Sequence, residues 1–264
     1  MSSDGSVVLM YHELEVEARP LCDDHSGYTH YVVKKSDFDE HVAVLRTNGF
    51  MGTKVSDAMR MCDNGHARVA ITFDDGCETD LAAAAPVLLA AGFQATFYVV
   101  TDWVGTRGHL SKSQVRELAE LGFEVGSHSR THAFLPELPT NRVHRELVES
   151  KETLEQMTGE TVQHFACPGG GFDERIAQLA QEAGYSTLAT SRAGKNSHGF
   201  VLSRVAVTRD MPSSEVLALS SGKHLVRRQI RAAILNRLRS TLGFSGYGRI
   251  RSCILDLGHS SWLK

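Results

Sequence analysis

The feature that most constrains the fold is a regular alternation between short apolar runs and longer segments with helical periodicity. Seven short runs are mostly apolar, as expected of strands that are buried on both faces. They are Val7–Tyr11, Val69–Phe73, Ala95–Val100, Phe123–Gly126, His164–Cys167, Ser186–Thr190 and Arg204–Thr208. A strand followed by a helix, repeated about seven times, favours a parallel barrel or a doubly wound sheet.

The segments between these runs place apolar residues three or four positions apart, which is the spacing of one buried helix face. They are Phe38, Val42 and Leu45, then Val115, Leu118 and Leu121, then Val143, Leu147, Leu154 and Met157, and finally Ile176, Leu179 and Ala183. Several helices are predicted to end where a glycine follows, because glycine adopts the left-handed conformation of a helix C-cap without strain. These glycines are Gly49, Gly92, Gly122 and Gly184.

Size and composition limit the class of protein. A chain of 264 residues, 42% of them hydrophobic, has enough material for one large domain or two small ones. A net charge of −3 and a pI of about 6.5 do not indicate nucleic acid as a partner. Five scattered cysteines without a CxxC pair indicate buried or free thiols in a reducing compartment.

The N-terminus bears on localisation. The first residues, MSSDGSVVLMYHEL, lack the basic and long apolar regions of an export signal. No apolar run in the chain reaches the ~18 residues that a membrane span needs. We therefore expect a cytoplasmic protein, although a chain trimmed of its export signal would look the same.

Polar residues with catalytic chemistry follow four of the predicted strands. In a parallel barrel the carboxyl ends of the strands meet at one rim, where catalytic groups gather. The residues at these ends are, in chain order, His12, the pair Asp74 and Asp75, His128, and Gly169. Four placements on one rim favour a functional site more strongly than any single motif does.

The segment TFDDG places two acids, Asp74 and Asp75, directly after an apolar strand. Because adjacent side chains point in different directions, one acid could bind a metal while the other faces a substrate. An Asp-Gly pair is also common in turns, so an ordinary turn is the alternative interpretation of Asp75.

The segment HSRTH places His128 and His132 four residues apart, so that both imidazoles could reach one ion from a single helical turn. With 13 histidines in 264 residues, about 0.6 such pairs arise by chance, so the pair gains weight only from its strand and from the aspartates. Two imidazoles, one carboxylate and an open position are typical of hydrolytic Zn²⁺, and Co²⁺, Ni²⁺ or Fe²⁺ would also fit. Such an ion lowers the pKa of bound water toward ~7, and the second aspartate could accept the proton.

TFDDG and HSRTH resemble the first two signature motifs of the polysaccharide deacetylases, also called carbohydrate esterase family 4 or the NodB-like domain. The resemblance runs from about Val7 to Thr208 and implies a distorted (β/α)7 barrel, in agreement with the seven strands. We therefore predict an α/β fold with residues 1–212 as the catalytic domain. Residues 213–264 are predicted to form a basic, amphipathic helical extension at the C-terminus.

The resemblance also implies roles for individual residues. Asp74 corresponds to the catalytic base. The residues that correspond to the metal ligands are Asp75, His128 and His132. The third family motif, an Arg-Pro-Pro-Tyr-like stretch, is replaced here by Ala-Cys-Pro-Gly-Gly, so the arginine that orients the base in many members is absent from it. The backbone N–H of Gly169 in this stretch would still stabilise the oxyanion.

This departure matches the subgroup that deacetylates poly-β-1,6-N-acetylglucosamine in biofilms. That subgroup also opens with a Tyr-His motif, as Leu9–Glu13 does here, and Thr29–Leu45 resembles the same subgroup. By this resemblance His12 acts as the general acid that protonates the leaving amine, and Arg204 orients the base.

Other residues support weaker interpretations. Trp103 follows a strand and could line a sugar-binding groove or cap the core. Cys167 has no base assigned to it, so we interpret it as a packing residue. In the more usual family arrangement His224 or His259 would supply the acid, although both have poor strand context.

The C-terminal segment is strongly basic, with not one acidic residue from Val216 to Leu255. Its basic residues are Lys223, Arg227, Arg228, Arg231, Arg237, Arg239, Arg249 and Arg251. An apolar stripe repeats every four residues, at Val226, Ile230, Ile234, Leu238 and Leu242. A cationic amphipathic helix suits an anionic membrane surface, so residues 223–251 are predicted to make peripheral membrane contact. The alternative is a helix packed on the barrel, with its arginines solvated or paired.

Together these patterns predict a metal-dependent hydrolase that removes N-acetyl groups from an amino-sugar glycan or a lipid-linked glycan, such as an exopolysaccharide. Metal-bound water is the expected nucleophile. Two alternatives stay open: a C–N hydrolase of the same fold acting on a small non-glycan amide, and an inactive glycan-binding module. The inactive module is disfavoured because base, ligands and candidate acid occur together.

Overall fold

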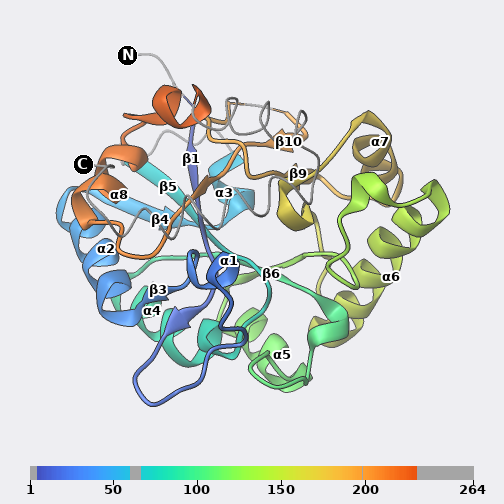
Figure 1. The fold of residues 1–264 in the computed structure, drawn as a ribbon, viewed down its shortest axis with the longest axis horizontal. Coiled ribbons are helices and arrows are strands. Elements are labelled where there is room, and N and C mark those ends of the chain that lie inside the picture. The colour runs from blue at the N-terminus through green and yellow to red at the C-terminus, as the bar shows by residue number, and fades with distance from the viewer. Residues whose placement is uncertain (1–4, 60–66, 198, 231–264) are drawn as a thin grey trace.

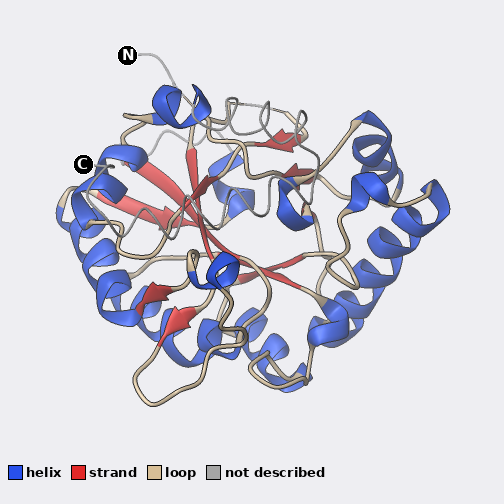
Figure 2. Cartoon of the chain, in the orientation of Figure 1, coloured by secondary structure: helices blue, strands red, loops and turns tan. Residues whose placement is uncertain are grey.

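The computed structural model describes residues 5–59, 67–197 and 199–230 of the chain. Within them the protein is an α/β fold, with a parallel sheet at the centre and helices around it (Figure 1 and Figure 2). In spatial order the strands are β10 (Val201–Leu202), β9 (Thr187–Ala189), β8 (His164–Ala166), β7 (Glu124–Ser127), β6 (Thr96–Val99), β5 (Ala67–Phe73), β1 (Val7–Tyr11) and β11 (Val205–Ala206). A further strand, β4 (Phe50–Thr53), also pairs with β5. In the described part of the chain this path ends at β10 and β11, which gives an open, distorted barrel.

All seven predicted strands are present, and the predicted fold class is confirmed. The register of β1 against β5 aligns Tyr11 with Phe73, so His12 and Asp74 leave the sheet at the same level. Strands β4 and β10 were not predicted. Two further strands, β2 (Leu14–Glu15) and β3 (Val33–Lys34), form a small separate sheet.

The helices lie around the edge of the sheet, as Figure 1 shows. The longer ones are α2 (Lys35–Thr47), α4 (Ala85–Ala91), α5 (Lys112–Glu120), α6 (Thr140–Thr158), α7 (Glu174–Glu182) and α8 (Ser213–Ser220). Two short helices, α1 (Ser26–Thr29) and α3 (Val55–Met59), lie in loops. The start of α5 is fixed by a capping box between Ser111 and Gln114, and α4 ends at Gly92 with a φ of +73°.

The two faces of the sheet differ in what they bury. Alternate residues of the central strands point toward the helices and form an aromatic layer, in which the Phe73 ring lies 5.3 Å from Tyr11 and 5.1 Å from Phe97. Many of the intervening positions are small or polar, such as Ala70, Thr72 and Thr96, whereas Met10 and Tyr98 are large. A side chain at Gly126 would come within 2.5 Å of the Tyr98 ring, so this glycine makes room for it.

The C-terminal part is described only as far as residue 230. Helix α8 packs against α2 and β1 and buries Val216 and Leu219 in the main core. Residues 225–230 are helical, and the two described members of the apolar stripe, Val226 and Ile230, are 67% and 57% exposed. The rest of the stripe and His259 lie outside the described residues, and the division at residue 212 stays a prediction. No helix in the described ranges combines the length and apolarity that crossing a membrane requires.

A candidate metal and catalytic centre

The aspartate pair leaves β5 with a sharp change of backbone direction. Asp75 has a φ of +81°, an uncommon conformation for a residue other than glycine, and Gly76 follows with a φ of +73°. The Asp74 N–H donates to the Tyr11 carbonyl and thus continues the pairing of β5 with β1. The turn separates the two carboxylates, so that each has its own set of neighbours.

Asp74 forms a buried, two-fold ion pair with Arg204. The guanidinium donates from Nη1 to Oδ1 at 2.6 Å and from Nη2 to Oδ2 at 2.7 Å. Arg204 is fully buried, donates from Nε to the Thr190 carbonyl at 3.1 Å, and lies 5.2 Å from the centre of the Tyr98 ring. The third motif lacks an arginine, and the guanidinium beside Asp74 comes instead from Arg204, the residue just before β11.

The ion pair fixes the charge of Asp74. Burial by itself would raise the pKa of Asp74, but the Arg204 guanidinium and His128 outweigh it and hold this pKa well below its usual range. The same contact raises the pKa of Arg204 against the effect of burial. Asp74 is thus ionised at any physiological pH. Arg204 occupies one lone pair on each carboxylate oxygen, and the remaining lone pairs can accept a proton or a hydrogen bond.

Asp75, His128 and His132 converge on one point. The Asp75 Oδ1 atom lies 3.6 Å from His128 Nε2 and 3.5 Å from His132 Nε2. It is buried and has no hydrogen-bond partner among the described residues, which is costly for a carboxylate oxygen. All three residues were predicted from the sequence to lie at this rim, and the structure brings them together.

The two histidines reach this point from a loop and not from the helical turn that the HSRTH spacing suggested. Residues 128–132 are irregular, and both Ser129 and His132 have positive φ, at +68° and +61°. The Nδ1 atom of His128 lies 2.9 Å from the Ala166 carbonyl on β8. That oxygen can only accept, so Nδ1 carries the proton and Nε2 offers its lone pair to the site.

A buried glutamate on α6 holds this loop in shape. Glu146 accepts hydrogen bonds from the backbone N–H groups of Arg130 and Thr131 at 3.0 and 2.8 Å. It also accepts one from the Thr131 hydroxyl at 2.8 Å. The sequence analysis missed Glu146, because nothing in a helical segment marks one acid as facing inward toward a distant loop.

The protonation of the three converging residues suits a cation. Burial lowers the pKa of His128 to about 3 and lowers that of His132, so both imidazoles are neutral. Burial, with the charge of Asp74 adding to it, raises the pKa of Asp75 to about 6. The Asp75 carboxylate, with its unpartnered Oδ1 atom, and the two neutral imidazoles form a donor set that lacks only a positive charge.

These residues fit a divalent ion of the zinc type. Oxygen and nitrogen ligands about 2.05 Å from a tetrahedral ion are about 3.35 Å from each other. The observed separations of 3.5 and 3.6 Å need only a small contraction to reach that value. Within the described residues, the same three residues form one of two groups whose ligand atoms all lie within 4.8 Å of each other.

The other predicted site residues lie on the same rim. His12 is half-buried, and its ring lies 5.0 Å from the Tyr31 ring at an interplanar angle of 35°. The Nδ1 atom of His12 is buried and has no hydrogen-bond partner among the described residues. Gly169 has a φ of +61° in the short turn Pro168–Gly170, which follows β8. The next two N–H groups of this turn donate to the carbonyls of Cys167 and Pro168, and that of Gly169 takes no part in these bonds.

Three residues with weaker interpretations are also placed. The Trp103 ring lies 4.9 Å from the His132 ring, beside the converging ligands. Cys167 is buried, as expected of a packing residue. His224 pairs with Glu215 of α8 at 2.8 Å. Asp80, which the sequence analysis missed, is fully buried, and neither of its carboxylate oxygens has a partner within the described ranges.

Comparison with known proteins places these features in context. Residues 59–188 match the family model described as polysaccharide deacetylase. The Bacillus subtilis protein YxkH is 28% identical over 214 residues, which cover 78% of this chain and 73% of YxkH. A peptidoglycan-N-acetylglucosamine deacetylase of Bacillus cereus is 28% identical over 129 residues, or 48% of this chain and 58% of that protein.

A solved structure shares the fold across most of the chain. The Streptococcus pyogenes deacetylase PplD, in complex with acetate, superposes with a TM-score of 0.72. The match is 21% identical in sequence and covers 82% of this chain and 98% of that one. At this level of identity the likeness concerns the fold.

Proposed function

The chain belongs to the polysaccharide deacetylase family, and we propose that it hydrolyses the N-acetyl amide of an amino-sugar glycan. One observation carries the proposal: an ionised Asp74, held by Arg204, stands beside three side chains that together form a donor set for a cation. The arrangement has a base and a ligand set side by side, as metal-dependent hydrolysis of an amide requires.

Asp75, His128 and His132 would hold the divalent ion, with Zn²⁺ as the first choice and Co²⁺, Ni²⁺ or Fe²⁺ as alternatives. When bound, the ion would lower the pKa of a coordinated water and polarise the amide carbonyl. Asp74 would take the proton of the attacking water as general base. The low pKa of Asp74 makes it a weak base. A weak base would be sufficient here, because the bound ion would lower the pKa of the water that gives up the proton.

The remaining steps fall to residues on the same rim. The N–H of Gly169 would donate to the oxyanion that develops on the carbonyl oxygen. His12 would protonate the departing amine, since it follows β1 at the level of Asp74 and its Nδ1 atom is buried without a hydrogen-bond partner among the described residues. Arg204 would act as a positioning residue, because it is fully buried and its guanidinium holds the Asp74 carboxylate.

The substrate class rests on the relatives, one of which is a peptidoglycan-N-acetylglucosamine deacetylase. The sequence resemblance to the biofilm subgroup favours a β-1,6-linked exopolysaccharide. The deciding experiment is acetate release by metal-loaded protein from chitooligosaccharides, peptidoglycan fragments, β-1,6-linked N-acetylglucosamine oligomers and small acylamines. The proposal is supported if acetate is released faster from any of the glycans than from the small acylamines.

The same panel addresses the two alternatives. Turnover of small acylamines alone would make the protein a C–N hydrolase of another substrate class on this fold. Glycan binding without acetate release, in protein that contains one equivalent of metal, would make it a binding module.

We further propose that the substrate is a lipid-linked glycan met at the cytoplasmic face of a membrane, with residues 223–251 as the contact. The support is the basic, acid-free composition of this segment. The test is co-sedimentation with vesicles with and without anionic lipid, at low and high salt. A variant with Arg227, Arg237 and Arg239 changed to Gln should lose binding, and wild-type indifference to anionic vesicles would refute the contact. Arg228 is kept, because it bonds to the Ala206 carbonyl and to Glu215.

A further inference from the structure

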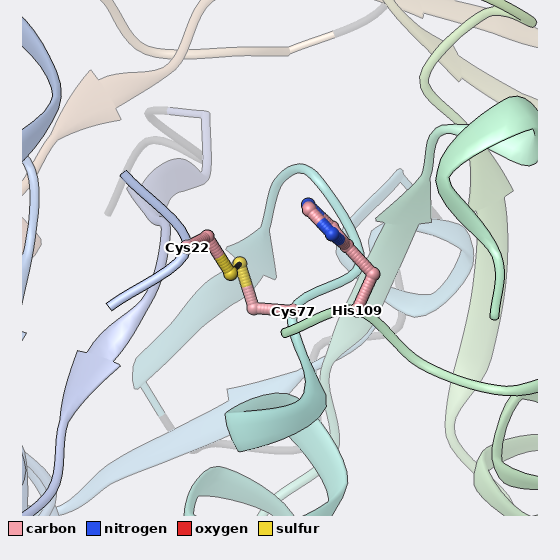
Figure 3. A group of neighbouring side chains, drawn as sticks. All are labelled: Cys22, Cys77 and His109. Carbon is pink, nitrogen blue, oxygen red and sulfur yellow. Dashed lines mark hydrogen bonds between the residues drawn. The ribbon is translucent and has the colours of Figure 1, made fainter. Parts of the chain in front are cut away.

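A second cluster of metal-binding side chains lies beside the candidate centre. Cys22, Cys77 and His109 come from three separate segments of the chain, and their ligand atoms all lie within 4.8 Å of each other. Figure 3 shows the two sulfur atoms turned toward each other, with His109 on the segment next to Cys77. None of these residues takes part in the centre described above.

The distance between the two sulfur atoms indicates what the cluster can hold. It is 3.8 Å, far longer than the bond of about 2.05 Å in a disulfide. Two thiolates about 2.3 Å from a tetrahedral zinc ion are about 3.8 Å apart. The thiols are therefore spaced as they would be around such an ion.

The backbone around the cluster is fixed by several contacts. Cys77 and His109 face each other across an antiparallel bridge, which the bond from the Leu110 N–H to the Gly76 carbonyl extends. Gly108 has a φ of +83°, and any side chain there would come within 2.7 Å of Cys22 Sγ. The glycine thus leaves room for the thiol at this position.

A buried carboxylate holds the Cys22 segment in place. Glu13 accepts the Cys22 backbone N–H at 3.0 Å and the Tyr28 hydroxyl at 2.7 Å. The Tyr28 hydroxyl oxygen in turn lies 3.6 Å from Cys77 Sγ. Outer contacts of this kind orient the ligands of metal sites and keep them in place before the ion arrives.

We propose that Cys22, Cys77 and His109 form a second cation site, which takes one borderline or soft divalent ion of the Zn²⁺ class. Thiolate ligands select such ions over Mg²⁺ and Ca²⁺, which prefer oxygen. Three protein ligands leave the fourth position of a tetrahedral ion for water or another small ligand.

The two sites are neighbours, so a test must tell them apart. The Trp103 ring lies 5.0 Å from the His109 ring and 4.9 Å from the His132 ring, so it neighbours one histidine of each group. Only the second site contains sulfur. Cobalt bound to thiolate has an intense near-ultraviolet charge-transfer absorption, which cobalt bound only to oxygen and nitrogen lacks. This absorption therefore reports binding at the second site alone.

The experiment titrates Co²⁺ into the reduced, metal-free full chain. The expected result is a thiolate-to-cobalt band that saturates at one equivalent of Co²⁺. A further equivalent should bind at Asp75, His128 and His132 without adding to this band. Cys22→Ser, which changes a half-buried thiol, should abolish the band and reduce the bound Co²⁺ by one equivalent. His109→Ala should lower the Co²⁺ affinity of the second site at least tenfold. His128→Ala should keep the band, and so should Cys167→Ala, which removes a thiol outside the cluster.

Three results would overturn the proposal. The first is the absence of a charge-transfer band in folded, reduced protein, and the second is a band that Cys22→Ser leaves unchanged. The third is a Cys22–Cys77 crosslink, detected by mass spectrometry without reductant, in a protein whose reduced form takes up no thiolate-bound cobalt. In that case the pair forms a disulfide and not a cation site.

Discussion

At the residue scale, the two adjacent aspartates of TFDDG behave as different groups because their surroundings differ. Asp74 faces a guanidinium that lowers its pKa, whereas burial raises the pKa of Asp75 to about 6. Pairs of titratable groups whose pKa values are pushed apart are typical of catalytic sites. The sequence predicts that the pair separates into two roles, and its resemblance to the biofilm subgroup implies that Arg204 orients the base. It does not predict that Arg204 and Asp74 form a buried, two-fold ion pair.

The role of Asp74 is tested by Asp74→Asn. We expect turnover to fall about 10²–10⁴-fold, the usual contribution of a general base, while metal content stays at the wild-type level. The variant should also be less stable, by about 3–5 kcal/mol, because it leaves the buried Arg204 charge without its partner. Asp102→Asn, at an exposed carboxylate near the same rim, is the control and should keep full activity. Turnover within twofold of wild type in Asp74→Asn would remove Asp74 as the base.

The role of His12 is tested through the pH profile of kcat/KM. A general acid works only while protonated, so the wild-type rate should fall on the basic side of the profile. We expect His12→Ala to lower kcat about 10²-fold or more and to remove that basic limb, with metal content unchanged. An unaltered rate and profile would mean that the acid lies elsewhere, and His259, outside the described residues, would be the next candidate.

Metal affinity should depend on pH through Asp75 and not through the histidines. A proton on Asp75 competes with the ion below its pKa of about 6, whereas burial lowers the pKa of His128 to about 3 and also lowers that of His132. Affinity should therefore be constant above pH about 6 and fall about tenfold per unit below it. Chelator competition across this range measures the slope. A slope of two or three protons, beginning near the ordinary histidine pKa of about 6.5, would contradict the assignment.

At the scale of elements, the parallel sheet explains why strand-end residues were predictable as a site. Buried parallel strands are nearly continuous apolar runs, so β1 and β5 could be located within one or two residues. Strands β4 and β10 were missed because one contains Gly52 and the exposed Met51, and the other has two residues. The sequence analysis predicted a helical turn for the loop after β7. That prediction was wrong, because the shape of the loop depends on hydrogen bonds to Glu146 of α6, which the spacing of the two histidines does not reveal.

That dependence gives a prediction for Glu146. Glu146→Gln loses a carboxylate oxygen that accepts hydrogen bonds from the loop, so the His128–His132 loop should loosen. We expect metal affinity to fall about 10–100-fold, as for other residues that orient metal ligands, with the fold retained. Glu149→Gln is the matched control on the same helix, since Glu149 makes only a half-exposed pair with Arg130. Equal metal affinities in the two variants would mean that Glu146 has no such role.

At the scale of the whole molecule, clusters assembled from distant segments were beyond sequence reasoning. Cys22, Cys77 and His109 follow no spacing motif, and the cysteines were accordingly interpreted as isolated thiols. The same limit affects the predicted division at residue 212, which rested on a change of composition. In the folded chain α8 lies beyond that division, yet it packs against α2 and β1.

The attachment of α8 can be measured by unfolding. Leu219 is fully buried in the main core, so Leu219→Ala should lower the free energy of unfolding by about 2–5 kcal/mol. Ile230→Ala is the matched control, because Ile230 is 57% exposed and its loss should cost no more than about 0.5 kcal/mol. Urea unfolding, followed by fluorescence and by circular dichroism, gives both values if the two probes coincide. If residues 213–264 were a separate unit, Leu219→Ala would leave the main transition unchanged and shift only a minor one. A single transition displaced to lower urea would instead extend the catalytic domain through α8, and any membrane contact would then begin after it.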